Sequence, residues 1–427
     1  MISAIHSVWP LMLGFFFIVL GQGLHSTLIG IRAGIENFDP VVTGIVISFY
    51  TAGLLCGTFF SGRLIQRIGH IRAYAMASAI SSAAMLMYVL VVNPFFWGFT
   101  RFLIGMAMTL IYAATESWLN DNAENHNRGA FLSVYMVVNN LGMGCGQFLL
   151  LVASPEGAEL FVLLSVLLSV SIIPVLLTVR NVPSFDAPSR MGMMQLYKIT
   201  PFGFVNVIFI GMLFGTLFVM AGVYTSEEGF SLFDTSLFVS ALIFAPAITQ
   251  TPIGRLSDRI DRRLVIIPLL IISIIILFVI ISIPDLSVTG KIICTGLLAG
   301  FLIPVHGLIM AHTNDFMTRQ QMVGASNALL RLFSCGALIS PPVVGFVMEI
   351  VGSAGYFYFM LVIAIVMVSY SLLRVGIRWG ALQAERSRFV GLPTTAGSTV
   401  AATMNPEAGL NEGSTEVTQA ESESQKS

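Results

Sequence analysis

Two charged residues, Arg101 and Glu116, stand inside an apolar stretch that runs from about residue 95 to residue 117. A guanidinium stays charged in a protein, and a residue about seven positions inside a helix lies roughly 10 Å from its end at ~1.5 Å per residue. Such a charge needs a ligand, a wet cavity or a partner, so Arg101 is a candidate for anion contact or for coupling. The alternative is that its side chain extends back to the outer end of the stretch.

Glu116 follows Arg101 by about fifteen residues, close to four helical turns, so both side chains could line one cavity from the same helix face. The residues directly after it, 117–121, are mostly polar where an apolar helix end would suffice. This cluster is suited to a gate or to a carboxylate that handles protons. A helix-end carboxylate paired with Arg128 would give the same pattern.

The composition shows which solvent surrounds these residues. The chain has 427 residues, of which 56% are hydrophobic and 10% charged, whereas a soluble domain carries about 25% charged residues. Its formal net charge of -1 gives no reason to expect a nucleic-acid partner. The four cysteines lie in apolar runs without metal-ligand spacing, and we expect them to be small buried residues. The lipid bilayer is therefore the expected environment.

Twelve apolar runs are long enough to cross a bilayer as helices, for which about 20 residues are needed. The predicted fold class is all-α integral membrane, with 12 transmembrane helices. The first run should remain in the mature protein, because no Lys or Arg precedes it and no plausible cleavage site follows it. The runs are 9–31, 41–62, 72–92, 95–117, 130–152, 159–179, 202–223, 233–253, 264–283, 290–312, 325–347 and 355–374.

The distribution of basic residues predicts the orientation. With a cytoplasmic N-terminus, most of the 21 Lys and Arg fall in cytoplasmic segments, and only Arg32 and Lys291 fall in outer loops. The positive-inside rule then predicts that both termini are cytoplasmic.

The chain repeats itself once. The run from Gly62 to Ile68 matches the run from Gly254 to Ile260, and two later dipeptides match at a near-constant offset of about 192 to 195 residues. Two pseudo-symmetric six-helix bundles are therefore expected, with a solute site near the midplane between them. The predicted domains are an N-terminal bundle at 1–180, a cytoplasmic linker at 181–201, a C-terminal bundle at 202–375, and a cytoplasmic, mostly disordered tail at 376–427.

The stretch from Gly62 to Arg72 resembles the loop signature of the major facilitator superfamily between helices two and three. The second copy lies where that family repeats the signature in its second half. Residues 116–120 and 69–72 resemble a bacterial branch, the YcaD-like transporters. Arg101 to Gly105 is similar to the family's fourth-helix arginine signature. The resemblance covers about residues 9–375 and implies the major facilitator fold.

Arginines in these loops could pair with carboxylates and helix ends across the cytoplasmic seam and so latch the outward-open state. Because Gln66 replaces the family's Asp in the first copy, we expect a stronger latch in the second. Ordinary loop charges would give the same residues. The predicted latch residues are Gly62, Arg63, Gln66, Arg67, Gly69, Arg72, Gly254, Asp258, Arg259 and Arg263.

The resemblance also implies that helices one, four, seven and ten line the cavity. Tyr112 and His306 correspond across the repeat, although a buried histidine is more often a packing residue. Arg331, in the eleventh run, is a further intramembrane cation that could belong to the cavity or to the latch. The predicted substrate or coupling residues are Arg101, Glu116, Tyr112, Gln22, His25, Asn206, His306 and Arg331.

The pattern predicts a secondary active transporter, not an enzyme, because phosphate-loop, zinc-protease and serine-hydrolase motifs are absent from the sequence. It would carry a small organic solute by alternating access with proton coupling, by symport or antiport, as a monomer in the cell inner membrane, without cofactor or metal. A non-transporting membrane sensor or scaffold on the same fold is the alternative.

Overall fold

The computed structural model describes residues 2–122, 128–177, 191–283 and 285–377, and every described element is a helix. The N-terminal helices are α1 (Ile2–Ile35), α2 (Pro40–Ile68), α3 (His70–Leu90), α4 (Pro94–Asn122), α5 (Arg128–Gln147), η1 (Phe148–Leu151), α6 (Glu159–Val170) and α7 (Ile172–Leu176). The later helices are α8 (Met193–Ile199), α9 (Pro201–Phe214), η2 (Gly215–Val219), α10 (Ala221–Glu227), α11 (Leu232–Ser257), α12 (Arg262–Ser282), α13 (Val288–Asn314), α14 (Arg319–Val351) and α15 (Gly355–Ile377).

The described residues contain 12 candidate membrane spans, which confirms the predicted number. Helix α8 falls inside the predicted linker at 181–201, while residues 181–190 lie outside the described part of the chain. Helix α15 ends at Ile377, and the predicted tail beyond it also lies outside the described residues.

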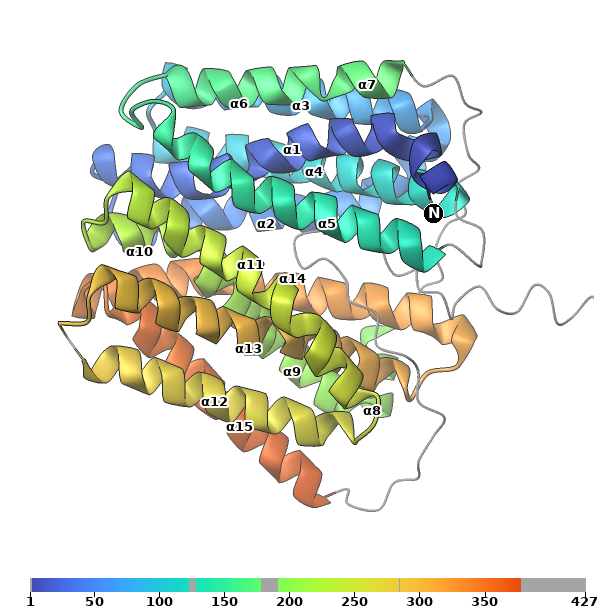
Figure 1. The fold of residues 1–427 in the computed structure, drawn as a ribbon, viewed down its shortest axis with the longest axis vertical. Helices are drawn as coiled ribbons and strands as arrows, with labels where there is room; N and C mark the ends of the chain where they lie inside the picture. Colours follow the sequence, from blue (N-terminus) through green and yellow to red (C-terminus); the bar gives the residue numbers. More distant parts are fainter. Residues whose placement is uncertain (1, 123–127, 178–190, 284, 378–427) are drawn as a thin grey trace, which may run out of the picture.

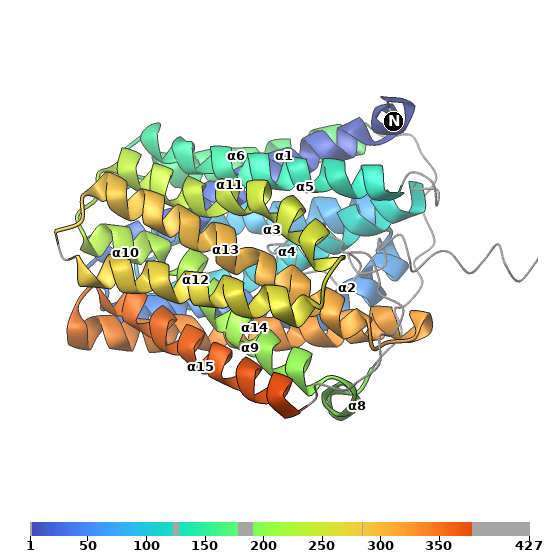
Figure 2. The ribbon, with the colours of Figure 1, turned by 60° about the horizontal axis from the view of Figure 1, so that its bottom comes forward.

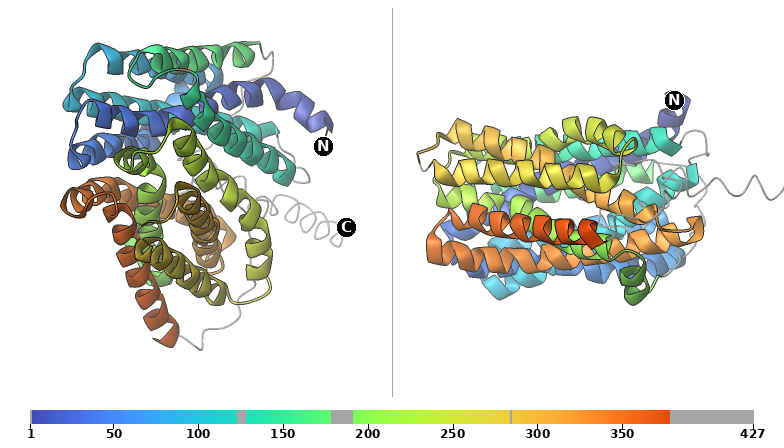
Figure 3. Two further views of the ribbon diagram at one scale, coloured as in Figure 1. Left: turned by 60° about the vertical axis from the view of Figure 1, so that its left-hand side comes forward. Right: turned by 90° about the horizontal axis from the view of Figure 1, so that it is seen from below.

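The spans form two bundles that lie side by side (Figure 1), with helices up to α7 in one half and helices from α9 onward in the other. The helices run roughly parallel to one axis, as the turned view shows (Figure 2). We call the end where α1 begins and α2 ends the proximal end, and the end where α1 ends and α2 begins the distal end. The N-terminus lies at the proximal end in each further view (Figure 3).

Glycines set how closely the helices approach within each half. A Cβ on Gly105 of α4 would meet the Gly53 Cα of α2 at 3.0 Å, and one on Gly23 of α1 would meet the Gly146 Cα of α5 at 3.1 Å. In the second half, a Cβ on Gly336 of α14 would lie 2.9 Å from the Met212 nitrogen of α9. Small residues at these crossings permit backbone contact, which drives helix association in lipid.

Helix α14 continues through Pro341 and Pro342 as one element. The prediction that the cysteines are buried needs correction. Cys145 and Cys335 are exposed rather than buried, which fits helix faces that meet lipid. The seventh span also contains the π-helix η2, a distortion of the kind often found at functional sites.

The two halves meet most closely at the distal end. A Cβ on Gly30 of α1 would lie 2.8 Å from the Val223 nitrogen of α10, and one on Gly222 would lie 2.6 Å from the Thr27 oxygen. Gly44 at the start of α2 packs directly against the Pro341 carbonyl of α14. Backbone therefore lies against backbone across the seam at these points of the distal end.

Candidate functional site

A partly open cavity lies between the halves, close to the middle of the spans. Its volume is about 110 Å³, counted as the space available to the centre of a water-sized sphere. The first half contributes Gln22, Ser26, Tyr50, Thr51, Leu54, Arg101, Tyr112, Met143 and Gln147, and the second contributes Phe214, Phe218, Val219, Val239, Ile243, Leu330, Phe333, Ser334 and Ala337.

Arg101 supplies a buried charge in the cavity wall. The residue is 2% exposed, and its Nη1 lies 3.3 Å from Nδ1 and 3.4 Å from Nε2 of His25 on α1, so it donates to whichever ring nitrogen lacks a proton. The guanidinium carbon lies 5.1 Å from the ring centroid of Tyr50 on α2. Its Nε has no hydrogen-bond partner among the described residues. Because histidine and tyrosine contact the cation and no acidic group is among the described lining residues, this wall carries a positive charge.

Gln147 connects three helices at the distal edge of the cavity. Its Nε2 donates to the Gly23 carbonyl at 2.8 Å, and its Oε1 accepts from the Thr27 hydroxyl at 2.6 Å. The backbone oxygen of Gln147 accepts from Ser236 of α11 at 2.9 Å. The amide therefore ties α5 to α1, while the main chain of the same residue ties α5 to the opposite half.

The wall from the second half is apolar and aromatic. The rings of Phe214 and Phe218 lie 4.4 Å apart, and that of Phe333 lies 5.3 Å from Phe214. Ser334 is the polar residue of this wall, and its hydroxyl donates to the Leu330 carbonyl of its own helix. The two walls are thus chemically unlike.

Glu116 lies on the same helix as Arg101 but outside the lining of this cavity. Glu116 is fully buried, and its Oε1 accepts a hydrogen bond from the Tyr135 hydroxyl of α5 at 2.8 Å. The Tyr135 ring stacks on Phe15 at 4.9 Å, and Phe15 also meets Tyr112 edge-on at 5.8 Å. An aromatic layer therefore separates the carboxylate from the cavity.

The other predicted residues divide between the cavity and its surroundings. Gln22 and Tyr112 line the cavity, whereas His25 lies outside the lining and contacts the Arg101 guanidinium. Asn206 and His306 lie outside the lining: Asn206 bonds to the Phe202 carbonyl and to Ser371, and His306 packs against Phe333 at 4.5 Å. Arg331 is placed over the Phe59 ring of α2 at 4.9 Å, so it bridges the halves beside the cavity.

Tyr50, Ser26 and the three phenylalanines belong to the cavity but were not predicted. The prediction considered helices one, four, seven and ten. The described lining includes residues of α2, α5, α11 and α14 as well, but none of the tenth span, α13. The sequence held one usable signal, the polar Gln147 at the end of a glycine-rich run. With 32 phenylalanines in the chain, the aromatic wall could not be distinguished from lipid-facing residues.

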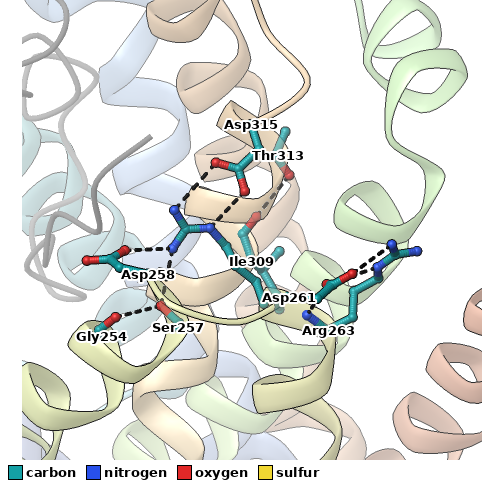
Figure 4. A network of polar contacts seen from close by, with 9 residues as sticks. Gly254, Ser257, Asp258, Asp261, Arg263, Ile309, Thr313 and Asp315 are labelled. Carbon is teal, nitrogen blue, oxygen red and sulfur yellow. Dashed lines mark hydrogen bonds and ion pairs between the residues drawn. The ribbon is translucent and has the colours of Figure 1, made fainter. Parts of the chain in front are cut away.

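The loop between α11 and α12, the second copy of the repeated signature, holds a network of polar contacts that includes Ser257, Asp258 and Asp315 (Figure 4). Arg262 is 2% exposed; its Nε and Nη2 donate to the Asp315 carboxylate at 2.8 and 3.4 Å. Its Nη1 donates to Asp258 at 3.3 Å and to the Ser257 hydroxyl at 3.2 Å. These bonds join the proximal ends of α11, α12 and α13.

The predicted latch residues are placed differently from what was expected. The cation that binds Asp258 is Arg262, which the prediction omitted, and Arg263 instead pairs with Asp261 at 3.0 Å. All of these bonds lie within the second half and do not cross to the first. In the first copy Arg63, Gln66, Arg67 and Arg72 are exposed.

The first copy is built around a neutral contact. Its counterpart of Arg262 is His70, 1% exposed, whose Nε2 lies 2.9 Å from the Ser117 hydroxyl of α4. Gly69 precedes it with φ of 85°, a left-handed conformation that favours glycine, where the second copy has Asp261. Among the described residues, the charged cluster of the second copy centres on Arg262 and its carboxylates, which the pattern did not indicate.

Comparison with known proteins identifies the architecture. A family model described as the Major Facilitator Superfamily matches residues 11–286 and 203–389. The chain belongs to this superfamily. The major facilitator fold predicted from the sequence is confirmed, and membership makes the chain a membrane transporter and not an enzyme.

Relatives within the superfamily confirm the predicted branch. The chain is 28% identical over 345 residues to the uncharacterized MFS-type transporter YcaD of Escherichia fergusonii, which covers 80% of this chain and 89% of that protein. It is 27% identical over 344 residues to YcaD of Salmonella typhimurium, with the same coverage of 80% and 89%. The likeness extends well beyond the motifs at 69–72 and 116–120 that indicated the YcaD-like branch.

Solved structures share the fold at low identity. A mutant of the nucleoside transporter NupG superposes with a TM-score of 0.76 at 11% identity, covering 86% of this chain and 98% of that chain. A bacterial homologue of the human lysosomal transporter Spinster, in its inward-facing and unoccupied conformation, gives 0.66 at 11% identity, covering 95% and 98%. At such identity these major facilitator structures support the fold alone.

Proposed function

We propose that this chain is a secondary active transporter that moves a small organic solute by alternating access, coupled to protons. The observation that carries the proposal is the central cavity, which lies between two repeated halves and beneath a seal of backbone contacts at one end. A rocking motion of the halves could break that seal and form another at the opposite end, because the cavity walls belong to different bundles. The protein works as a monomer in this proposal.

The proximal end faces the cytoplasm of a bacterial inner membrane in this proposal, with both termini inside. Basic residues gather at the proximal helix ends, as in Arg63, Arg67 and Arg255. At the distal end Arg32 is paired with Glu36, and Lys291 with Glu228. Such asymmetry supports a cytoplasmic proximal end. The sealed distal end would then make the conformation inward-facing.

Glu116 is the proposed proton-handling group. It is a buried carboxylate in the proximal part of α4, and its hydrogen bond to Tyr135 links α4 to α5. A carboxylate that gains a proton there would lose its buried charge, which favours a change of helix packing. For a solute that raises the melting temperature in a library screen, Glu116→Gln should retain exchange of labelled for unlabelled solute but lose accumulation driven by a pH gradient. If Glu116→Gln still accumulates the solute when a pH gradient is applied, Glu116 is not the proton-coupling group.

A disulfide across the distal seal tests alternating access. A Cβ on Gly34 would lie 3.9 Å from the Ser226 Cβ, which suits a disulfide between α1 and α10. Ser334→Cys would report cavity access in a background in which the native cysteines, Cys56, Cys145, Cys294 and Cys335, are replaced. The probe is a membrane-impermeant maleimide, applied to right-side-out and inverted vesicles.

Alternating access predicts labelling of Ser334→Cys from both sides of the membrane. Adding Gly34→Cys and Ser226→Cys and oxidising them should abolish labelling from the distal side and leave proximal labelling intact, and reduction should restore the distal reaction. Gly34→Cys alone is the matched control and should not change access. If the distal side is never labelled before oxidation, a fixed, sensor-like protein is the better interpretation.

A further inference from the structure

We propose that the transported solute is an amphipathic organic monoanion, with its anionic group at Arg101 and its apolar body against the phenylalanine wall of the second half. The inference rests on the proposed transport function and specifies its substrate class. It follows from the unlike chemistry of the two cavity walls, taken together with the polar atoms that lack partners inside the cavity.

The positive charge of Arg101 is the first step of the argument. A guanidinium keeps its proton, and a buried cation is unfavourable unless an anion or water compensates it. Neither Asp nor Glu is among the described residues that line this cavity. The groups that do hold Arg101, His25 and Tyr50, reduce the cost of burial but cannot cancel the charge. A solute that brings a negative charge would complete the site.

Unpartnered polar atoms show where that anion would bind. The Arg101 Nε, the Tyr112 hydroxyl and the Gln22 Oε1 all belong to lining residues and lack hydrogen-bond partners among the described residues. Buried polar atoms are normally hydrogen-bonded, so a group of three in one wall marks a place for a polar ligand. Two of them carry N–H or O–H donors, which match the oxygens of a carboxylate, sulfonate or phosphate ester.

The opposite wall selects the rest of the molecule. Phe214, Phe218 and Phe333 form one aromatic surface, extended by aliphatic residues such as Val239 and Ile243. Ser334 already bonds within its own helix, so this wall offers little to a sugar or another polyhydroxylated body. An apolar or aromatic body gains by leaving water and by ring contacts.

The charge of the ligand is limited to one. Among the described lining residues, Arg101 is the single Lys or Arg. Arg331 lies outside the lining, over the Phe59 ring. A second negative charge would be buried without a cation, at a cost that one arginine does not offset. The volume of about 110 Å³ also favours a small molecule.

A matched set of small probes tests the inference on purified full-length protein. The probes are p-toluenesulfonate, its neutral isostere p-toluenesulfonamide, the cation p-methylbenzylammonium, and methanesulfonate, which has the anionic group without the aromatic body. Binding is measured by equilibrium dialysis, and flux of labelled p-toluenesulfonate is followed in proteoliposomes. We expect p-toluenesulfonate to bind at least about tenfold more tightly than each of the others, because a charge-assisted contact and an apolar contact are each worth that much.

Variants assign the binding to the two walls. Arg101→Gln should weaken p-toluenesulfonate binding roughly 10- to 100-fold and leave the sulfonamide unchanged. Phe218→Ala should weaken p-toluenesulfonate while leaving methanesulfonate as it is. Arg255→Gln is the matched control, since it removes an exposed cation at the proximal end of α11, away from the lining, and it should leave binding as in the wild type. Gel filtration and thermal unfolding establish that each variant is folded.

The outcomes separate this inference from the transport proposal. Arg101-dependent binding of p-toluenesulfonate without flux would support the anion site and count against transport. Flux of a neutral or cationic solute, with p-toluenesulfonate failing to bind, would support transport and overturn the anion class. Equal binding of methanesulfonate and p-toluenesulfonate would reduce the site to an inorganic-anion site and overturn the amphipathic part.

Discussion

Each half of this transporter buries one arginine among the described residues, and the two are treated in opposite ways. Arg101 and Arg262 are both 2% exposed. Arg262 at the proximal end of the second half is bound by Asp315 and Asp258. Arg101 at the middle of the first half meets His25 and Tyr50, with no carboxylate in the cavity wall.

Burial of an arginine does not by itself indicate its function. A buried cation with carboxylates on two helices fixes the positions of those helices, and its loss leaves uncompensated charges. A buried cation without such partners is stabilised only when something else supplies the negative charge. The repeat makes the contrast sharper, because Thr295 stands in the second half where the first has Arg101. The first half therefore carries the charged cavity wall, and the second half carries the charged cluster at the proximal helix ends.

The largest expected effect follows from removing the structural cation. Arg262→Gln should lower the free energy of unfolding by roughly 3 kcal/mol, because Asp315 and Asp258 lose a shared partner. The measurement is equilibrium unfolding in mixed micelles of a mild detergent and dodecyl sulfate. Arg255→Gln, an exposed cation at the end of α11, is the control and should change the value by less than about 1 kcal/mol. If Arg262→Gln and Arg255→Gln lower the free energy of unfolding equally, Arg262 does not have the structural role assigned to it.

The same substitution at Arg101 should have a far smaller effect on stability. Arg101→Gln loses contacts with His25 and Tyr50 but also removes the cost of a buried charge, so we expect a free energy of unfolding within about 1 kcal/mol of the wild type. The same unfolding titration measures it, and melting temperature in detergent provides a second readout. A loss as large as that of Arg262→Gln would mean that Arg101 is structural, and the comparison between the two arginines would fail.

Hydropathy was sufficient to predict the spans, because lipid imposes a length and a composition on every crossing helix, and the internal repeat predicted the two bundles. These signals were insufficient for the proximal cluster. The second loop offers Arg255, Arg259, Arg262 and Arg263 within a few residues, and only the packing of α12 against α13 buries one of them. The alignment of Arg262 with His70, which is also buried, was the available signal.

The cavity could be predicted only in part. Arg101, Tyr112 and Gln22 are polar residues in apolar runs, and this contrast is visible in a sequence. Phe214 and Phe333 provide no such contrast, because an apolar residue suits a cavity wall, a helix contact and a lipid face equally. Long-range packing decides among these, and a single sequence does not encode it in any local pattern.

The neutral contact of the first copy should be weaker than the ion pair of the second. A double-mutant cycle with His70→Ala and Ser117→Ala should give a coupling energy of about 1 kcal/mol, typical of a neutral hydrogen bond. The corresponding cycle with Arg262→Gln and Asp315→Asn should give about twice that value, because the bond is charge-assisted. Equal coupling energies would show that the two copies of the loop are energetically equivalent despite their different residues.

The smallest expected effect concerns Asp261, which caps α12 and pairs with Arg263 outside the spans. Partial burial alone would raise the pKa of Asp261. Hydrogen bonds from the Arg263 side chain and backbone N–H, together with the positive charge of Arg263, outweigh the effect of burial and lower that pKa. The folded state therefore binds the proton less readily than the unfolded state. Its contribution to stability is complete above the ordinary aspartate pKa of ~3.9 and is lost as the pH falls through the lower value of the folded state.

Because the carboxylate is 38% exposed, water screens the pair, and Asp261→Asn should cost less than about 1 kcal/mol at pH ~7. Measured against the wild type by unfolding titrations at decreasing pH, the difference should shrink below pH ~4 as the wild-type carboxylate becomes protonated. A difference that stays constant across this range would show that the side chain stabilises α12 through its geometry as a cap rather than through its charge. The charged character of the second loop would then rest on Arg262 and its two carboxylates.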